Sequence, residues 1–120
     1  MADKGMTANQ VMQAVVEALQ AKKAKEVKVL ETGELTILAD YFVICTATST
    51  THIKTLSDEV QKQLEEKGET ILHVEGYRSG GWVLIDLGCV IVHIFLDEQR
   101  EFYSLERLWG DAKEIAVEEK

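Results

Sequence analysis

The alternation of hydrophobic and mixed positions along the stretch GWVLIDLGCVIVHIF predicts a tight β-hairpin. Two strand-like runs, 82–87 and 90–95, are separated only by Gly88 and Cys89. A two-residue link with glycine first suits a type II′ turn, because glycine accepts the positive φ that this turn requires. The predicted pairs are Leu87 with Val90, Asp86 with Ile91, Leu84 with His93, and Trp82 with Phe95.

This register divides the hairpin into two faces, because successive side chains of a strand point in opposite directions. One face is wholly aliphatic and predicts a core: Val83, Ile85, Leu87, Val90, Val92 and Ile94. The other face mixes large apolar groups with a carboxylate and an imidazole: Trp82, Leu84, Asp86, Ile91, His93 and Phe95. Aromatic residues beside a few polar groups are typical of partner-binding surfaces. A second interpretation is equally open, in which a helix of the same chain covers this face and hydrogen-bonds Asp86.

Apolar residues at helical spacing predict a first helix over about 8–23, with Thr7 opening it in a capping box. A second helix is expected to start at Ser49 or Thr50 and to end at Gly68. A third helix near the C-terminus carries the apolar residues Phe102, Leu105 and Leu108.

Short apolar runs predict the remaining strands, at 27–30, 41–46 and 71–75. The run 41–46 is almost wholly apolar, as expected for the middle of a covered sheet. The resulting element order indicates an α/β (α+β) fold, a mixed five-stranded sheet with flanking helices. We expect a single domain over residues 1–120, with residues 1–6 frayed and a polar tail over 111–120.

The charge of the chain limits its partners. The 120 residues carry a formal net charge of −8, which argues against direct nucleic-acid binding because phosphates require a Lys/Arg footprint. An acidic protein can still associate with a basic protein, including one attached to RNA. We interpret Lys22, Lys23 and Lys25 as a solvated helix end, where cations oppose the negative pole of the dipole, rather than as a binding patch.

The cysteines and the missing targeting and membrane-span patterns predict the compartment of the protein. Cys45 and Cys89 both lie in strand-like runs and are interpreted as small buried residues of a reducing compartment. No apolar run has the length of a membrane span, and the start of the chain has neither a signal sequence nor an Arg-rich transit pattern. We therefore expect a cytoplasmic protein without membrane contact.

Catalytic chemistry finds little support in the residue pattern. The three histidines and two cysteines show no metal-ligand spacing, so we expect no metal and no cofactor. A Cys89–His93 nucleophile pair is disfavoured because the two side chains are predicted to lie on opposite faces. Asp86 and His93 are diagonal neighbours, about 7–8 Å apart at the backbone, and an ion pair or a partner contact suits them better than an acid–base dyad.

The element order most resembles the nucleotidyltransferases, and this defines the alternative function. That chemistry uses two closely spaced metal-binding carboxylates on a strand, whereas this hairpin strand offers only Asp86. We therefore expect a nucleotidyltransferase-like fold without catalytic residues. The alternative is a small nucleotidyltransferase-like enzyme that depends on Asp86 and a second ligand.

Three stretches together resemble the ribosomal silencing factor, or Iojap, family: DYFVICTATSTTHIKTLSDEV at 40–60, EGYRSGGWVLIDLGCVIVHIF at 75–95 and REFYSLERLW at 100–109. The resemblance covers nearly the whole chain after about residue 8, and its motifs are long and specific. It departs at Cys89, where the family usually has Asp, and in the loop ATST, where GTS or GSS is commoner. The absence of an organellar targeting extension leads us to expect a bacterial member.

The resemblance implies a non-catalytic protein that binds the large ribosomal subunit through its interface protein L-fourteen. Bound there, it would block joining of the small subunit and lower translation when nutrients are scarce. The family's docking surface includes the Trp of the GW motif, here Trp82, and strand parity extends that surface to the mixed face of the hairpin. Tyr103 matches the final motif and is a further candidate, with anchoring of the last helix as its alternative role. The family also implies a possible homodimer of the free protein, which would compete with the ribosome for this face.

Overall fold

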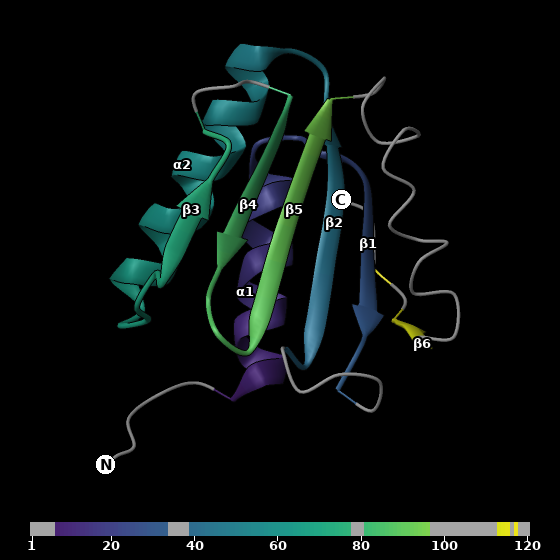
Figure 1. The fold of residues 1–120 in the computed structure, drawn as a ribbon, viewed down its shortest axis with the longest axis vertical. Helices are drawn as coiled ribbons and strands as arrows, with labels where there is room; N and C mark the ends of the chain where they lie inside the picture. The colour runs from purple at the N-terminus through teal and green to yellow at the C-terminus, as the bar shows by residue number, and fades with distance from the viewer. Residues whose placement is uncertain (1–6, 34–38, 78–80, 97–112, 116, 118–120) are drawn as a thin grey trace.

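A mixed β-sheet with helices on one side organises the chain, as seen in a computed structural model that describes residues 7–33, 39–77, 81–96, 113–115 and 117 (Figure 1). The elements in chain order are α1 (Ala8–Ala21), β1 (Lys25–Glu31), β2 (Tyr41–Ala47), α2 (Thr50–Glu66), β3 (His73–Glu75), β4 (Trp82–Asp86), β5 (Val90–Leu96) and β6 (Lys113–Ile115). The predicted α/β class and mixed sheet are confirmed.

The sheet has the strand order β3-β4-β5-β2-β1-β6. Only β2 and β5 pair in parallel, and the other neighbours are antiparallel. The nearly all-apolar strand β2 lies between β5 and β1, which agrees with the covered central position expected of it. Both α1 and α2 contact each other and the same side of the sheet, behind it in the view of Figure 1. No described helix lies on the opposite face.

Local capping chemistry defines the ends of both helices. At the start of α1, Thr7 Oγ1 accepts a hydrogen bond from the Gln10 amide at 3.1 Å, and the Thr7 amide donates to Gln10 Oε1 at 3.0 Å, which forms the predicted capping box. Ser49 caps α2 by accepting from the amide of His52 at 3.0 Å, so it is Ser49 rather than Thr50 that takes this role. Gly68 follows the end of α2 with φ +89°.

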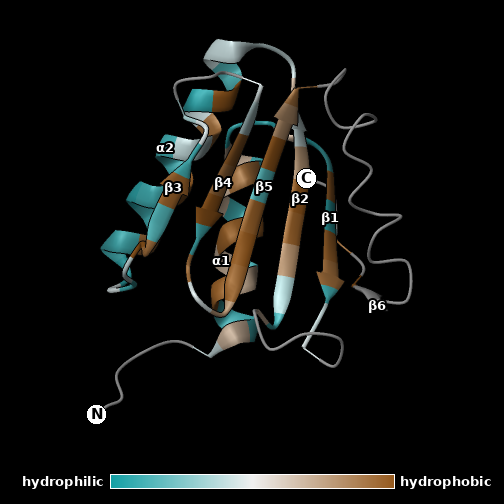
Figure 2. Cartoon of the chain, viewed as in Figure 1, coloured by the Kyte–Doolittle hydropathy of each residue, from teal (hydrophilic) through white to brown (hydrophobic). Residues whose placement is uncertain are grey.

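The core lies between the helices and the aliphatic face of the hairpin. All six residues predicted for that face are buried: Val83, Ile85, Leu87, Val90, Val92 and Ile94. They pack with the apolar stripes of α1 and α2, and the α2 stripe consists of Ile53, Leu56, Val60 and Leu64 as predicted. Figure 2 shows the strands β2 and β5 as mostly hydrophobic. Each fully buried aliphatic side chain contributes about 1.5–3 kcal/mol, so this layer dominates stability.

The polar tail predicted over 111–120 contains a strand that the sequence did not predict. Residues 113–115 form β6, which pairs antiparallel with β1 and sets Val29 opposite Ile115. Without it, β1 would present an edge of unpaired amides and carbonyls, and backbone pairing of this kind depends little on a Glu-rich composition. The described sheet therefore has six strands rather than five. The predicted frayed segment 1–6 and the third helix lie outside the described residues.

Candidate functional site

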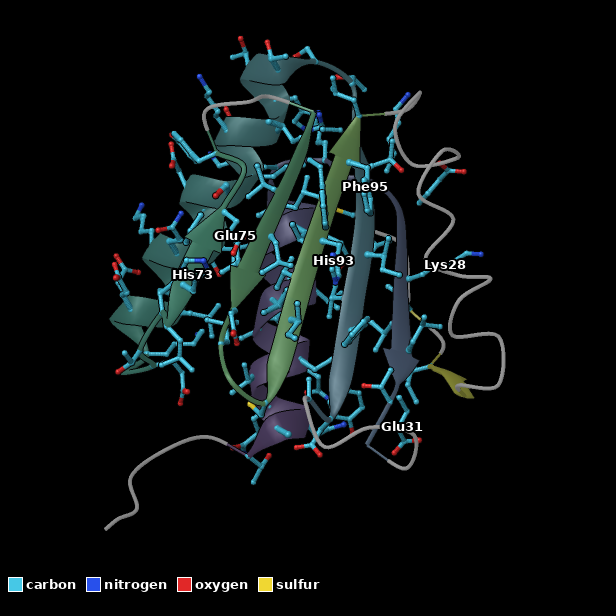
Figure 3. The ribbon with its side chains drawn as sticks, viewed as in Figure 1. Lys28, Glu31, His73, Glu75, His93 and Phe95 are labelled. Atoms are coloured by element: carbon cyan, nitrogen blue, oxygen red, sulfur yellow. The ribbon has the colours of Figure 1, made fainter. Side chains whose placement is uncertain are left out.

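The mixed face of the hairpin forms as the alternation predicts. In the observed register Trp82 lies opposite Phe95, Leu84 opposite His93, and Asp86 opposite Ile91. The turn is closed by the Leu87 amide, which donates to the Val90 carbonyl at 2.9 Å, and Gly88 has the required positive φ of +89°. These six residues lie on the face away from α1 and α2, and Figure 3 shows His93 and Phe95 along β5.

Residues from two further strands extend this face. Phe42 and Ile44 of β2 form a buried cluster with Phe95, and Leu30 and Ala39 belong to the same cluster. Sequence reasoning missed them because an all-apolar strand gives no sign of which face each residue takes. Their placement follows from the parallel β2–β5 pairing, which sets Ile44 opposite His93 and which no local signal encodes.

Three stacked rings define the centre of the face. The Trp82 and Phe95 rings are 5.6 Å apart at an interplanar angle of 9°, and the Trp82 and His93 rings are 5.9 Å apart at 13°. His93 and Phe95 are 6.1 Å apart at 5°. Stacked aromatic pairs contribute roughly 0.5–1.5 kcal/mol each beyond their buried area. We call Trp82, His93 and Phe95 the ring stack, and its geometry holds the Trp82 side chain in place.

A hydrogen bond fixes the tautomer of His93 within the ring stack. Trp82 Nε1 lies 3.3 Å from His93 Nδ1. An indole nitrogen can only donate, so Nδ1 must be the acceptor and the imidazole proton sits on Nε2. Burial lowers the pKa of His93 to about 4, which keeps the ring neutral. Nε2 is buried and has no hydrogen-bond partner in the described part of the chain.

Asp86 corrects one expectation from the sequence. An ion pair with the diagonal neighbour His93 was one of the two expectations for Asp86, but Asp86 Oδ1 accepts from the Gly88 amide at 2.8 Å. A partner contact of Asp86 stays a prediction. Aspartate side chains readily bond a backbone amide two residues ahead, and the tight turn brings that amide within reach. His93 bonds Trp82 instead. The carboxylate therefore stabilises the turn, and Asp86 and His93 do not form an acid–base dyad.

Exposure divides the six predicted partner-binding residues into two groups. Trp82, Leu84, Asp86 and Ile91 are partly exposed and lie within reach of a partner. His93 is only 5% exposed and Phe95 only 1%, so these two support the surface from beneath. The seventh candidate, Tyr103, lies outside the described residues.

The backbone behind Trp82 is constrained by a glycine. Gly76 has φ +81°, and a Cβ added there would lie 2.0 Å from the Trp82 carbonyl oxygen. Any side chain at this position would displace the Trp82 backbone. The next residue, Tyr77, donates from its hydroxyl to Asp58 Oδ1 on α2 at 3.0 Å, and this hydrogen bond raises the pKa of Tyr77. The segment before Trp82 is thus tied to α2.

The structure does not bring the remaining cysteine and histidine candidates together. Cys89 packs against the helix-side core, on the opposite face from His93, and burial raises the pKa of its thiol rather than activating it. His52 accepts from the Thr48 amide at 2.9 Å and bonds the Lys22 carbonyl at 2.8 Å, whereas His73 pairs with a glutamate on its own strand. Among the described residues no three His, Cys, Asp or Glu side chains gather. None of the described helices is long and apolar enough to span a membrane.

Comparison with known proteins agrees with this arrangement. Residues 5–120 match the family described as "Ribosomal silencing factor during starvation". A ribosomal silencing factor from Halalkalibacterium halodurans is 39% identical, over 94% of this chain and 97% of its own length. A crystal structure of a Chromobacterium violaceum protein is similar with a TM-score of 0.86 and 38% identity, and covers 88% of both chains. A Mus musculus protein named "Mitochondrial assembly of ribosomal large subunit protein 1" is 31% identical over 79% of this chain and 43% of its own length.

The fold and the face together define a small mixed α/β protein with an ordered aromatic surface and, among its described residues, no cluster of side chains that could hold a metal ion. The chain belongs to the ribosomal silencing factor family. The resemblance found in its motifs is thereby confirmed, and the family names connect it with ribosome silencing and the regulation of translation.

Proposed function

We propose that this protein binds the large ribosomal subunit through ribosomal protein L-fourteen and blocks association with the small subunit. Occupation of that surface represses translation under nutrient limitation. The family description, which names starvation, and a relative named for the ribosomal large subunit support this proposal. The net charge of −8 also suits a basic ribosomal protein as the direct partner.

The observation that carries the proposal is the fixed orientation of the partly exposed Trp82 side chain. Its indole is partly exposed, yet the ring stack and the bond to His93 hold it in one orientation. A preordered aromatic side chain loses little conformational freedom on binding, which is why such residues dominate binding energies. Leu84 and Ile91, also partly exposed, complete an apolar surface around it.

Replacement of Trp82 tests the proposal. Trp82→Ala should leave the core intact and weaken binding to large subunits by roughly 2–4 kcal/mol, because it removes the central aromatic contact. The measurement is co-sedimentation with separated large and small subunits, together with the yield of joined ribosomes. We expect binding to the large subunit alone, lost in the variant.

A matched control is available at Leu72, a large apolar residue that is 62% exposed and lies outside the mixed face. Leu72→Ala removes exposed apolar surface as well and should bind as the unmodified protein does. Unchanged binding of a folded Trp82→Ala protein would contradict the assigned surface. Absence of binding by the unmodified protein to either subunit would contradict the function itself.

The proposed mechanism is steric and needs no catalysis. The enzyme alternative requires Asp86 as a metal ligand, whereas its carboxylate accepts from Gly88. We further propose that the free protein associates with a second copy through the same apolar surface, so that dimer and ribosome compete. In both cases the protein acts in the cytoplasm, where ribosomal subunits join.

A further inference from the structure

The turn between α1 and β1 carries a group of positive charges that lies outside the mixed face of the hairpin and has no role in the function proposed above. Lys22, Lys23 and Lys25 are all exposed there, at one corner of a chain whose net charge is −8. The sequence alone favoured a solvated helix end. The backbone conformation of this corner adds an observation that the sequence could not supply.

Both helices end in the same Schellman motif but use different residues at its left-handed position. After α2 this residue is Gly68, at φ +89°, and its amide donates to the Glu65 carbonyl at 3.0 Å. After α1 it is Lys23, at φ +63°, and its amide donates to the Gln20 carbonyl at 3.0 Å. Glycine is favoured there because a Cβ crowds the backbone. Lys23 therefore occupies its position at a conformational cost, which points to a role for its side chain.

A second strained residue lies close by. Glu26, at φ +51°, and Lys23 are the two non-glycine residues with positive φ in the described segments. Both line one cavity of about 500 Å³, together with Lys25. Glu26 Oε1 accepts from Thr46 Oγ1 at 3.3 Å, so this carboxylate engages the sheet. Backbone strain of this kind concentrates at ligand sites.

The corner is also braced from α2. His52 holds the Lys22 carbonyl at 2.8 Å through Nε2, while its Nδ1 accepts from the Thr48 amide at 2.9 Å. Because an amide can only donate, the proton of His52 is on Nε2, which donates to that carbonyl. The end of α1 is thereby fixed against the start of α2, so the lysines project from an ordered turn.

The strand register relates this corner to the docking face. Lys25 lies opposite Thr46, Thr46 opposite Phe95, and Phe95 opposite Trp82. Three strand spacings of about 4.8 Å place Lys25 roughly 14 Å from Trp82 along one end of the sheet. The cavity at this corner is lined in part by Val27 and Val117, which pack with the helix-side core, so a partner must extend around this end of the sheet to contact both Trp82 and the lysines.

We propose that Lys22, Lys23 and Lys25 form a phosphate-binding corner that contacts the RNA backbone of the large subunit while Trp82 contacts protein. This inference rests on the proposed function. Lysine ammonium groups bind phosphate oxygens as point charges and set orientation rather than sequence preference. In a chain of net charge −8, these three exposed lysines offer a local positive site for the RNA backbone, and this proposal revises the expectation of no direct nucleic-acid binding.

The test is the salt dependence of binding to purified large subunits. A variant with Lys22→Gln, Lys23→Gly and Lys25→Gln should bind at least about tenfold more weakly at low salt. The slope of log affinity against log salt should fall by roughly 2–3, at about 0.7–0.9 per phosphate contact. Lys23→Gly alone should raise the melting temperature, because it relieves the strained φ, and should still weaken binding. Lys67→Gln, an exposed lysine at the far end of α2, is the matched control and should change neither property.

Parallel titrations with isolated ribosomal protein L-fourteen and with inorganic phosphate identify the contact. The lysine variant should bind L-fourteen normally, whereas Trp82→Ala should not, and millimolar phosphate should weaken only the lysine-dependent part of subunit binding. Equal salt slopes for the variant and the unmodified protein would overturn this inference alone. Equal loss of binding to L-fourteen and to the subunit would overturn it too, by assigning the lysines to protein. If the unmodified protein fails to bind large subunits at all, both proposals fall.

Discussion

His93 shows how one buried residue supports a surface that it does not itself expose. Its ring stacks with both the Trp82 indole and the Phe95 phenyl group, and its Nδ1 accepts a hydrogen bond from the Trp82 indole. Protonation would place a hydrogen on Nδ1 and remove the acceptor of that bond. The lowered pKa therefore preserves the orientation of Trp82 at neutral pH.

The pKa of His93 predicts how stability depends on pH. The folded pKa is about 4, below the ordinary value of 6.5, so as the pH falls the unfolded chain binds the proton first. The contribution is complete above about pH 6.5 and is lost between there and about pH 4, amounting to about 3 kcal/mol at about 1.4 kcal/mol per pH unit. Urea unfolding at a series of pH values measures it.

A variant without a titrating group at position 93 separates the contribution of His93 to the pH dependence of stability from that of the carboxylates. His93→Gln cannot take up a proton, so its free energy of unfolding should vary less with pH than that of the unmodified protein. The two pH profiles of the free energy of unfolding should diverge in slope between pH 6.5 and pH 4. Above pH 7 the two profiles should run parallel. Profiles that also run parallel between pH 6.5 and pH 4 would contradict the assignment.

Strand β4 contributes to the core and to the mixed face through alternate residues. Ile85 is fully buried against the helices, whereas its neighbour Leu84 is partly exposed on the mixed face. The alternation is a property of any strand, and the aliphatic and mixed composition of the two faces gives each its use. Stability and docking can therefore be separated within adjacent positions.

Alanine at Ile85 should mainly lower stability, whereas alanine at Leu84 should mainly weaken docking. Ile85→Ala leaves a cavity in the core and should lower the free energy of unfolding by roughly 2–5 kcal/mol, while the folded fraction still binds large subunits. Leu84→Ala should lower it by only roughly 1 kcal/mol and weaken docking by about 1–2 kcal/mol. Urea titration and co-sedimentation measure the two quantities. Equal loss of docking in both variants, corrected for folding, would show that β4 does not divide its roles in this way.

At the scale of the whole molecule, the described helices gather on one side of the sheet and leave the aromatic side without one (Figure 1). Phe95 and Ile44 are nevertheless buried, and the partly exposed residues form the outer surface of this side. A surface with Trp82, Leu84 and Ile91 at its centre suits association with a ribosomal protein or with a second copy.

Competition between these two partners is a testable consequence of the proposed dimer. Raising the protein concentration should increase the sedimentation coefficient, and Trp82→Ala should shift this transition to higher concentration because it weakens the shared surface. Isolated L-fourteen should dissociate the dimer into one-to-one complexes. Sedimentation velocity follows all three species. A dimer that persists in Trp82→Ala and binds L-fourteen intact would show that the two surfaces are separate.

Local sequence was sufficient to predict the hairpin and both described helices. The turn at Gly88 set the register, alternation separated the two faces, and Thr7 and Ser49 marked where the helices start. These features depend on residues close together in the chain, so their energetics are visible in the sequence. Family motifs added the ribosomal connection, which no local pattern encodes.

Tertiary structure alone decided which strands lie side by side and how deeply each candidate residue is buried. The β2–β5 pairing brings Phe42 beside His93, and the β1–β6 pairing turns a charged tail into a strand. Burial made His93 and Phe95 supporting residues, and the turn geometry drew Asp86 to Gly88. Contacts between distant segments depend on the packing of the entire sheet, so composition and periodicity cannot specify them.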